Sequence, residues 1–256
     1  MYIARTNSTN TLLKELIAKG QWPMAERFIR AGYQTAGRGQ TGNGWESEPD
    51  KNLLCSVLIS RQLSAFSNQP FYLNVAISVA VHKAVMGYGL PVTGLTIKWP
   101  NDIYWNDQKI AGILIENATI GNEVKYSIAG IGLNVNQTAF VSDAPNPVSL
   151  KQITGKDYDL DELMARLMEE IDEGLRDSGD GLWEYYKAHL YRREGFWSFV
   201  EREVNTAPTM NADSKEPIAD RFMARIEEVL PTGEIVLQDQ QGKERKYHFK
   251  QVRYVI

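Results

Sequence analysis

The sequence has one cysteine, few histidines and no long apolar segment. Because Cys55 is alone among 256 residues, an intrachain disulfide and a thiol-rich metal site are excluded. Cys55 lies within an apolar run, where we expect a small buried hydrophobic residue. The histidines, His82, His189 and His248, are far apart in sequence and lack ligand spacing. We therefore expect no histidine-based metal site.

Signals for export, membrane insertion and general nucleic-acid binding are also missing. Residues 1–10 are polar and lack the apolar core of a signal peptide. No apolar stretch approaches the roughly 20 residues that span a bilayer. The formal net charge of -4 does not indicate the basic face of a nucleic-acid-binding protein. We expect a cytoplasmic protein that has no contact with membranes.

Hydrophobic periodicity predicts three helices. Ser8-Thr9-Asn10 offers good N-cap residues before leucines at helical spacing, and Gly20 supplies a stop, which predicts a helix over about residues 9–19. Apolar residues from Leu73 to Val85 form one face of a second, longer helix. Asp159 can cap a third amphipathic helix.

Strands are predicted between these helices, over residues 25–31, 52–60 and 96–99 and at several places within 103–135. Hairpin turns are expected at Asn106-Asp107 and at Gly121-Asn122. Beyond about residue 190 come two short strands around a turn at Pro231-Thr232-Gly233, one more strand from Tyr247 to Val252, and a polar loop over residues 205–217. This mixture indicates an α+β fold rather than strict βαβ alternation.

A glycine-rich segment, Gly37-Arg38-Gly39-Gln40-Thr41-Gly42, matches G-x-G-x-x-G. The dinucleotide-binding fingerprint requires a helix that starts at the loop. Here the loop continues into residues 43–49, which form no apolar helical face, so we reject that interpretation. Glycines let backbone N–H groups approach an anion, and Arg38 adds donors suited to carboxylate or phosphate. From the loop alone, a flexible surface segment with a solvated arginine fits equally well.

Two further segments carry candidate ligand contacts. Pro100 fixes a bend after a strand, and Lys109 precedes an apolar strand that contains Gly112. A lysine there suits an anionic ligand, although a solvated strand-end lysine is the usual case. In Gly130-Ile131-Gly132-Leu133-Asn134, the two glycines predict either a bulge or a floor on which a flat ligand rests, with Asn134 beside it.

Taken together, these segments resemble the biotin–protein ligases. The resemblance rests, in the family's order and approximate spacing, on Ser8-Thr9-Asn10, on Gln34 through Gly37-Arg38-Gly39 to Trp45, on Lys98-Trp99-Pro100-Asn101-Asp102 with Lys109-Ile110-Ala111-Gly112, and on Gly130 to Asn134. It implies a catalytic domain over residues 1–190, with a central mixed β-sheet and flanking helices like those of class II synthetases. It also implies an SH3-like β-barrel over residues 191–256.

The resemblance further implies a two-step reaction. Biotin and MgATP would give biotinyl-AMP, and the biotinyl group would then pass to a lysine of a biotin carboxyl carrier protein. Lys109 and Arg38 are the implied catalytic residues. The implied biotin-binding residues are Ser8, Thr9, Asn10, Gln34, Gly37, Arg38, Gly39, Gln40, Lys109, Gly112 and Gly130. The implied ATP-binding residues are Arg38, Trp45, Asn101, Lys109, Asn134 and Arg253. Asp102 is expected to help with magnesium, without a dedicated metal site.

The sequence departs from the family at two places. The position after Gly39 is often a second arginine in the family but is Gln40 here, so we expect this loop to hold biotinyl-AMP less strongly by charge. Ser8 lies almost at the start, where some members carry a winged-helix domain, so we expect no sequence-specific DNA binding. A homodimer through an exposed sheet edge is a further expectation.

Two alternative functions stay open. One is a lipoate ligase or an octanoyl or lipoyl transferase, which would depend on lipoate rather than on biotin. The other is a biotin- or nucleotide-binding module that has lost catalysis and forms no biotinyl-AMP. The presence of both Arg38 and Lys109 argues against the second.

Overall fold

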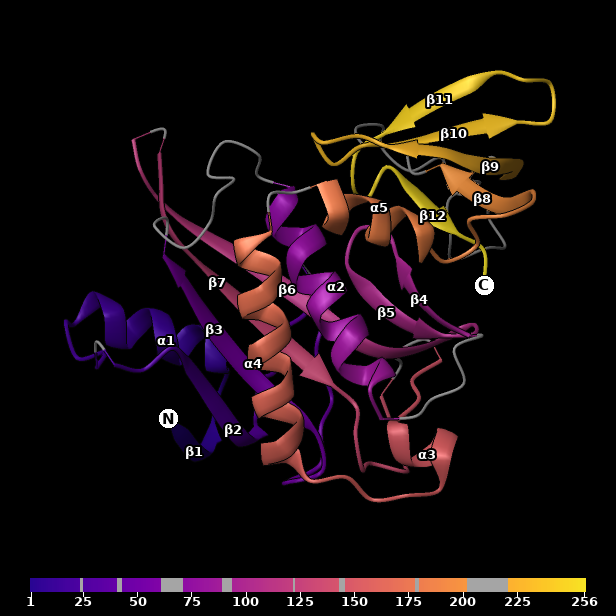
Figure 1. The fold of residues 1–256 in the computed structure, drawn as a ribbon. Coiled ribbons are helices and arrows are strands. Elements are labelled where there is room, and N and C mark those ends of the chain that lie inside the picture. The colour runs from indigo at the N-terminus through magenta and orange to yellow at the C-terminus, as the bar shows by residue number, and fades with distance from the viewer. Residues whose placement is uncertain are drawn as a thin grey trace, which may run out of the picture.

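The computed structural model describes residues 1–23, 25–40, 43–60, 71–88, 94–121, 123–142, 146–177, 180–201 and 221–256. Two β-sheets organise these residues, a seven-stranded sheet formed by about the first half of the chain and a five-stranded sheet at the C-terminal end (Figure 1). Helices pack mainly against the larger sheet. The described part of the chain is therefore an α+β fold, as the sequence predicts.

The larger sheet is mixed. Its strands are β1 (Tyr2–Thr6), β2 (Phe28–Gln34), β3 (Leu53–Ser60), β4 (Leu95–Lys98), β5 (Asp102–Trp105), β6 (Gln108–Ile120) and β7 (Glu123–Leu133). They lie in the order β1-β2-β3-β7-β6-β5-β4. Strands β1 and β2 are parallel, and the remaining neighbours are antiparallel. The parallel pair requires a crossover connection, which contains α1 (Thr9–Ala18).

One face of this sheet is covered by α2 (Tyr72–Met86) and α4 (Leu160–Arg176), which pack on each other (Figure 1). Helix α2 is buried on most of its circumference, so its apolar residues face both the sheet and α4. The side chain of Asp159 accepts hydrogen bonds from the backbone N–H groups of Asp161 and Glu162, which confirms the predicted cap of α4. Helix α5 (Asp180–Ala188) also packs on α2, and the short helix α3 (Leu150–Thr154) is hydrogen-bonded to the residues that follow β7.

The opposite face of the sheet is covered only in part, by α1. Leu13 of α1 meets Ile29 and Ile128 in a small separate core. Because side chains alternate across a strand, the residues of β6 and β7 on this face include three glycines. Gly112 pairs with Gly132, and Leu114 pairs with Gly130. This stretch therefore exposes backbone that other groups can approach closely.

The C-terminal sheet contains β8 (Trp197–Glu201), β9 (Arg221–Val229), β10 (Ile235–Asp239), β11 (Glu244–Tyr247) and β12 (Val252–Tyr254). It is antiparallel, in the order β11-β10-β9-β8-β12. Trp99 joins the two sheets, because its indole N–H donates to the carbonyl of Gly233 (3.1 Å) and its ring meets Phe249 edge-on. An SH3-like barrel and a domain boundary at residue 190 stay predictions.

Several elements differ from the sequence prediction. Strand β2 begins at Phe28 rather than at residue 25, and two strands, β11 and β12, replace the single strand expected from Tyr247 to Val252. Strands β1 and β8 and helices α3 and α5 were not predicted, because short strands and short helices leave weak periodic signals. Thr41, Gly42, Asn122 and the expected loop over residues 205–217 lie outside the described residues.

Cys55 is buried on the helix-covered face of β3, as predicted from its apolar neighbours. Burial raises the pKa of the Cys55 thiol to about 12, so almost no thiolate is present near neutral pH. We expect no reaction with Ellman's reagent at pH 8 in the native protein and full reaction in denaturant. Rapid labelling of the native protein at this pH would contradict the buried position.

His82 on α2 is fully buried and lies 3.0 Å from the Tyr185 hydroxyl and 3.0 Å from the Leu95 carbonyl. Burial lowers the pKa of His82 to about 4. Protons then favour the unfolded chain, whose histidine pKa is near 6.5, so stability present at pH 7 is lost as the pH falls from 6.5 towards 4. The full loss is about 3 kcal/mol at roughly 1.4 kcal/mol per pKa unit.

Urea unfolding of wild type, His82→Gln and His248→Gln at pH 7 and pH 4 measures this effect. The loss of unfolding free energy between the two pH values should be smaller in His82→Gln than in wild type. It should be nearly unchanged in His248→Gln, because the His248 side chain is exposed. Equal pH dependence in all three proteins would mean that His82 is not held neutral.

Candidate functional site

A buried polar cluster lies where α1 begins. Ser8, Thr9 and Asn10 are each less than 5% exposed, although all three are polar. The backbone N–H of Thr9 donates to Gln34 Oε1 at 2.8 Å. Ser56 Oγ of β3 lies 2.7 Å from Thr9 Oγ1 and within hydrogen-bond distance of Asn10 Oδ1. The fold thus brings Thr9, Asn10 and Gln34 together, as expected for one ligand-binding end.

Gly130 is required by Asn10. A Cβ at Gly130 would overlap the Asn10 side-chain oxygen, so only glycine lets the first turn of α1 pack this closely on β7. The prediction that Gly130 forms the floor for a flat ligand is therefore not what this arrangement shows, because a protein side chain occupies that contact.

Trp45 lies against the other two glycines of this face. A Cβ at Gly132 would overlap the indole Cε2, and a Cβ at Gly112 would lie 2.9 Å from Cζ3. The flat group that rests on this backbone is thus the indole of Trp45. Its Nε1 is buried and has no hydrogen-bond partner among the described residues. An unpaired buried donor of this kind is rare in native structures and marks a position where a polar ligand atom could bind.

Lys109 lies beside Trp45 at the start of β6. Its Nζ is 2.7 Å from Asp102 Oδ2 and 5.9 Å from the centroid of the Trp45 ring. The end of the Lys109 side chain also approaches Gly112. The ammonium group therefore has a carboxylate on one side and an aromatic face on the other. With 27% of its side chain exposed, it remains accessible to an incoming anion.

Arg38 reaches β6 from the glycine-rich loop. Its guanidinium lies 3.3 Å from Glu116 Oε2, and Glu116 also accepts from Lys14 Nζ (2.6 Å) and Asn10 Nδ2 (2.8 Å). Burial acts to raise the pKa of Glu116, but the hydrogen bonds from Lys14 and Asn10 outweigh it, and the pKa is lowered. Glu116 is therefore ionised at neutral pH and links Arg38 to the polar cluster of α1.

The glycine-rich loop folds back on itself instead of entering a helix. The backbone N–H of Trp45 donates to the Gly37 carbonyl, and that of Gly39 donates to the Asn43 carbonyl, both at 2.9 Å. This geometry supports the rejection of a dinucleotide-binding fingerprint. Gln40 Nε2 donates to Asn101 Oδ1 (3.2 Å), which ties the loop to the turn after β4.

The remaining predicted residues are more dispersed. Asn134 follows β7 and is buried; its Nδ2 donates to the Val148 carbonyl (3.2 Å), and its Oδ1 has no hydrogen-bond partner in the described part of the chain. Gln40 Oε1 is likewise buried without one. Arg253 lies on β12 of the smaller sheet, opposite Val200. Its contribution to the same site stays a prediction.

Sequence reasoning missed Ser56, Glu116 and Lys14. A usable signal existed for Glu116, because it is two and four residues from Leu114 and Gly112 on one strand and so shares their face. Ser56 lies in an otherwise apolar strand, and its contact with α1 depends on packing between elements that are distant in sequence.

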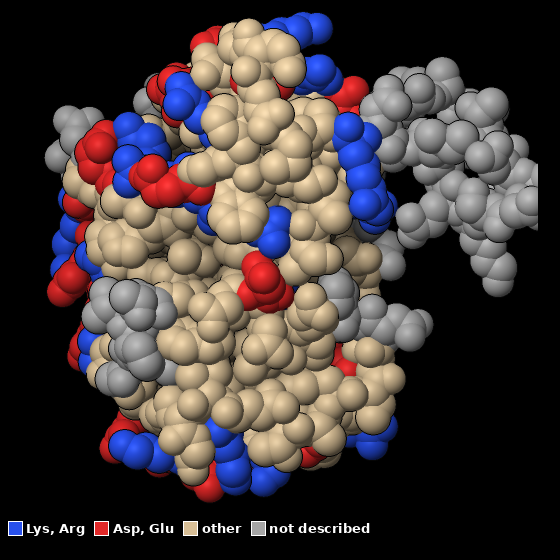
Figure 2. Space-filling model, turned by 90° about the vertical axis from the view of Figure 1, so that its right-hand side faces the viewer, with Lys and Arg blue, Asp and Glu red and all other residues tan. Residues whose placement is uncertain are grey.

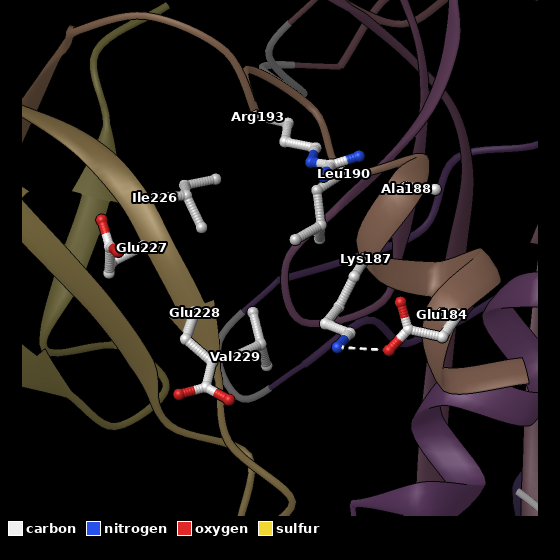
Figure 3. A pocket seen from close by; sticks show the side chains of 9 residues that line it. All are labelled: Glu184, Lys187, Ala188, Leu190, Arg193, Ile226, Glu227, Glu228 and Val229. Carbon is white, nitrogen blue, oxygen red and sulfur yellow. Dashed lines mark ion pairs between the residues drawn. The ribbon is translucent and has the colours of Figure 1, made fainter. Parts of the chain in front are cut away.

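A hollow lined by other residues does not belong to this cluster. It lies between α5 and β9 and is lined by Glu184, Lys187, Ala188, Leu190, Arg193, Ile226, Glu227, Glu228 and Val229 (Figure 3). Lys187 points towards Glu184, and the two form an ion pair of 2.6 Å. With three glutamates against one lysine and one arginine, this hollow is unsuited to phosphate.

Other classes of site receive no support from the described residues. They contain no group of three or more His, Cys, Asp or Glu side chains that could hold a metal ion. None of their helices is long and apolar enough to cross a membrane. Figure 2 shows a largely uncharged face whose basic and acidic side chains lie mostly near its rim. That distribution does not form the broad basic surface typical of nucleic-acid binding on this face.

Comparison with known proteins gives a family. The model of the biotin/lipoate A/B protein ligase family matches residues 2–134. The biotin–[acetyl-CoA-carboxylase] ligase of Paracoccus denitrificans is 31% identical over 169 residues, which are 64% of this chain and 68% of that protein. The corresponding ligase of Mycobacterium tuberculosis is 30% identical, over 66% of this chain and 61% of that protein. The chain thus aligns with roughly two thirds of these relatives.

Solved structures agree on the fold. The biotin protein ligase of Aquifex aeolicus, in complex with biotin and ATP, superimposes with a TM-score of 0.77 at 20% identity, and the match covers 100% of this chain and 98% of that one. At this identity the likeness concerns the fold alone. Together with the sequence matches, it places the chain in the biotin/lipoate A/B protein ligase family.

Proposed function

We propose that the chain is an ATP-dependent ligase that converts biotin to biotinyl-AMP and transfers the biotinyl group to a lysine of a biotin carboxyl carrier protein. The observation that carries this proposal is the arrangement on the open face of the larger sheet. A polar cluster at Thr9 and Asn10 and two cations, Arg38 and Lys109, lie around bare strand backbone. The names of the two bacterial relatives support biotin as the substrate.

The reaction needs no nucleophile from the protein. A carboxylate oxygen of biotin attacks the α-phosphorus of ATP, and pyrophosphate leaves with the electrons of the broken P–O bond. The lysine amine of the carrier then attacks the acyl carbon, and AMP leaves as the amine loses its proton. Rate enhancement comes from holding the two reactants together and from positive groups aimed at the phosphoryl oxygens.

The polar end of biotin binds Ser8, Thr9, Asn10 and Gln34. Its rings and chain lie along the backbone near Gly37 and Gly39 and along the Asn10 and Trp45 side chains that cover Gly130 and Gly112. Gln40, in the glycine-rich loop, is a further biotin-binding residue. Arg38 and Lys109 meet the carboxylate and the α-phosphate. These cations are paired with Glu116 and Asp102, so an anionic ligand would exchange one negative partner for another. Trp45, Asn101, Asn134 and Arg253 contribute to the nucleotide side.

Magnesium is expected with ATP, and one carboxylate of the site suits it. Mg²⁺ in nucleotide enzymes is commonly held by one or two carboxylates together with phosphate oxygens and water. Asp102, beside Lys109, is the carboxylate that would hold it here. When bound, the ion would neutralise part of the phosphate charge.

The finer architecture is part of the same proposal. The C-terminal sheet would form an SH3-like barrel over residues 191–256, next to a catalytic domain over residues 1–190. The absence of sequence-specific DNA binding and the possible homodimer stay predictions.

Exchange of labelled pyrophosphate into ATP tests the function directly. We expect exchange that depends on biotin, because the first step is reversible and releases pyrophosphate. Exchange with lipoate in place of biotin would move the protein to lipoate ligation. Measurable biotin binding without exchange would favour a binding module that has lost catalysis.

Lys109→Ala tests the main catalytic assignment. We expect biotin-dependent exchange to fall by about 10²–10³-fold, which is typical for removing one group that stabilises transition-state charge. Lys151→Ala is the matched control, since Lys151 is a partly exposed lysine paired with Asp157 near α3. Equal activity of the two variants would show that Lys109 is a solvated strand-end lysine.

A further inference from the structure

Glu116 accepts hydrogen bonds from three side chains of the site, and the proposed reaction gives it no role. It lies on β6, on the face that carries the glycines, and 21% of its side chain is exposed. Its carboxylate accepts from Lys14 at 2.6 Å and from Asn10 at 2.8 Å, whereas Arg38 is 3.3 Å away. Lys14 and Arg38 are both more than 40% exposed, and exposed ion pairs are weak. The contact with the buried Asn10 is therefore the one with structural consequence.

This contact fixes the orientation of the Asn10 amide. A carboxylate and a backbone carbonyl can only accept hydrogen bonds. Asn10 Nδ2 faces both kinds of acceptor, Glu116 Oε2 and the carbonyl of Leu114 (3.4 Å). The amide oxygen must then be the atom that faces Ser56, which is the arrangement found.

The donor and acceptor roles of Ser56 and Thr9 follow from this orientation of the Asn10 amide. Ser56 has one hydroxyl proton, and Asn10 Oδ1 can only accept it. The 2.7 Å contact between Ser56 Oγ and Thr9 Oγ1 is then favourable only if Thr9 donates. Thr9 Oγ1 is also 3.1 Å from Gln34 Oε1, but its single proton cannot serve both contacts, and Gln34 Oε1 still accepts from the Thr9 backbone N–H at 2.8 Å. The chain of donors thus runs from Thr9 to Ser56 to Asn10 and ends at Glu116.

We infer that Glu116 is a positioning residue that sets the hydrogen-bond polarity of the biotin-binding end of the site, an inference that rests on the proposed function. With its proton directed to Ser56, Thr9 Oγ1 presents lone pairs. With its oxygen held by Thr9, the Gln34 amide presents its Nε2 as a donor. A urea-type head group carries both N–H donors and a carbonyl acceptor, so it finds complementary partners. A head group without them leaves these buried groups unpaired, which is strongly disfavoured.

A double-mutant cycle on biotin affinity tests this inference. The proteins are wild type, Glu116→Gln, Ser56→Ala and the double variant, with dissociation constants from calorimetry and steady-state constants from exchange assays. Glu116→Gln replaces an acceptor by an amide that can also donate, so the direction of the chain is no longer fixed. We expect about tenfold weaker biotin binding for each single variant, equivalent to roughly one strong hydrogen bond.

The pattern of effects identifies the mechanism. If Glu116 and Ser56 act through one chain, the double variant should bind biotin about as well as either single variant. The KM for biotin should rise, while kcat at saturating biotin and the KM for ATP change less than about threefold. Multiplicative losses in the double variant, or an effect mainly on kcat or on ATP, would overturn the inference, because they indicate independent action or action through Arg38.

Controls keep the result interpretable. Glu15→Gln removes the same charge from an exposed position of α1 and should leave biotin binding unchanged. If Glu116→Gln does not fold, Glu116→Asp replaces it in the cycle, because it keeps the charge and withdraws it from Asn10. Wild type that neither binds biotin nor supports exchange would refute the proposed function itself. Biotin binding that is equal in wild type and both Glu116 variants would refute only the role of Glu116.

Discussion

The arrangement of the site depends on the absence of side chains on one face of β6 and β7. Gly112, Gly130 and Gly132 leave the backbone bare at neighbouring cross-strand positions. Asn10 and Trp45 approach the sheet there from two separate segments of the chain, and each would overlap a Cβ. A sheet normally gains stability from cross-strand side-chain pairs, so this face gives up local packing in order to admit groups from elsewhere.

The cations of the site are paired with carboxylates of the same chain. Lys109 is paired with Asp102, and Arg38 and Lys14 are paired with Glu116. Unpaired charges on partly buried side chains would be unfavourable, and the carboxylates of Asp102 on β5 and Glu116 on β6 remove that penalty. A bound anion can take the place of these carboxylates as the partner of Lys109 and Arg38. Binding of an anion therefore depends on how well its oxygens fit these cations rather than on a net positive charge of the site. This fits a chain whose overall charge is negative.

The elements that the sequence predicted well are those with long periodic patterns, such as α2, α4 and β3. Arg38 and Lys109 could be singled out because they occupy unusual local contexts, a glycine-rich loop and the start of an apolar strand. Ser56 and Glu116 could not be identified in that way, since their importance comes from strand register and from the packing of α1. The glycines of β6 and β7 were recognised as close-approach positions, but the approaching groups were side chains of the same chain.

Trp99 links the larger sheet to the smaller one. Its buried indole is hydrogen-bonded to the β9–β10 turn and contacts Phe249. Two and three residues further along the chain, Asn101 contacts Gln40 and Asp102 contacts Lys109. A shift of the β9–β10 turn would therefore be passed through Trp99 and Asn101 to Gln40, which lies in the same loop as Arg38. The contacts of the smaller sheet with Trp99 therefore help to hold in place the turn that carries Asn101 and Asp102.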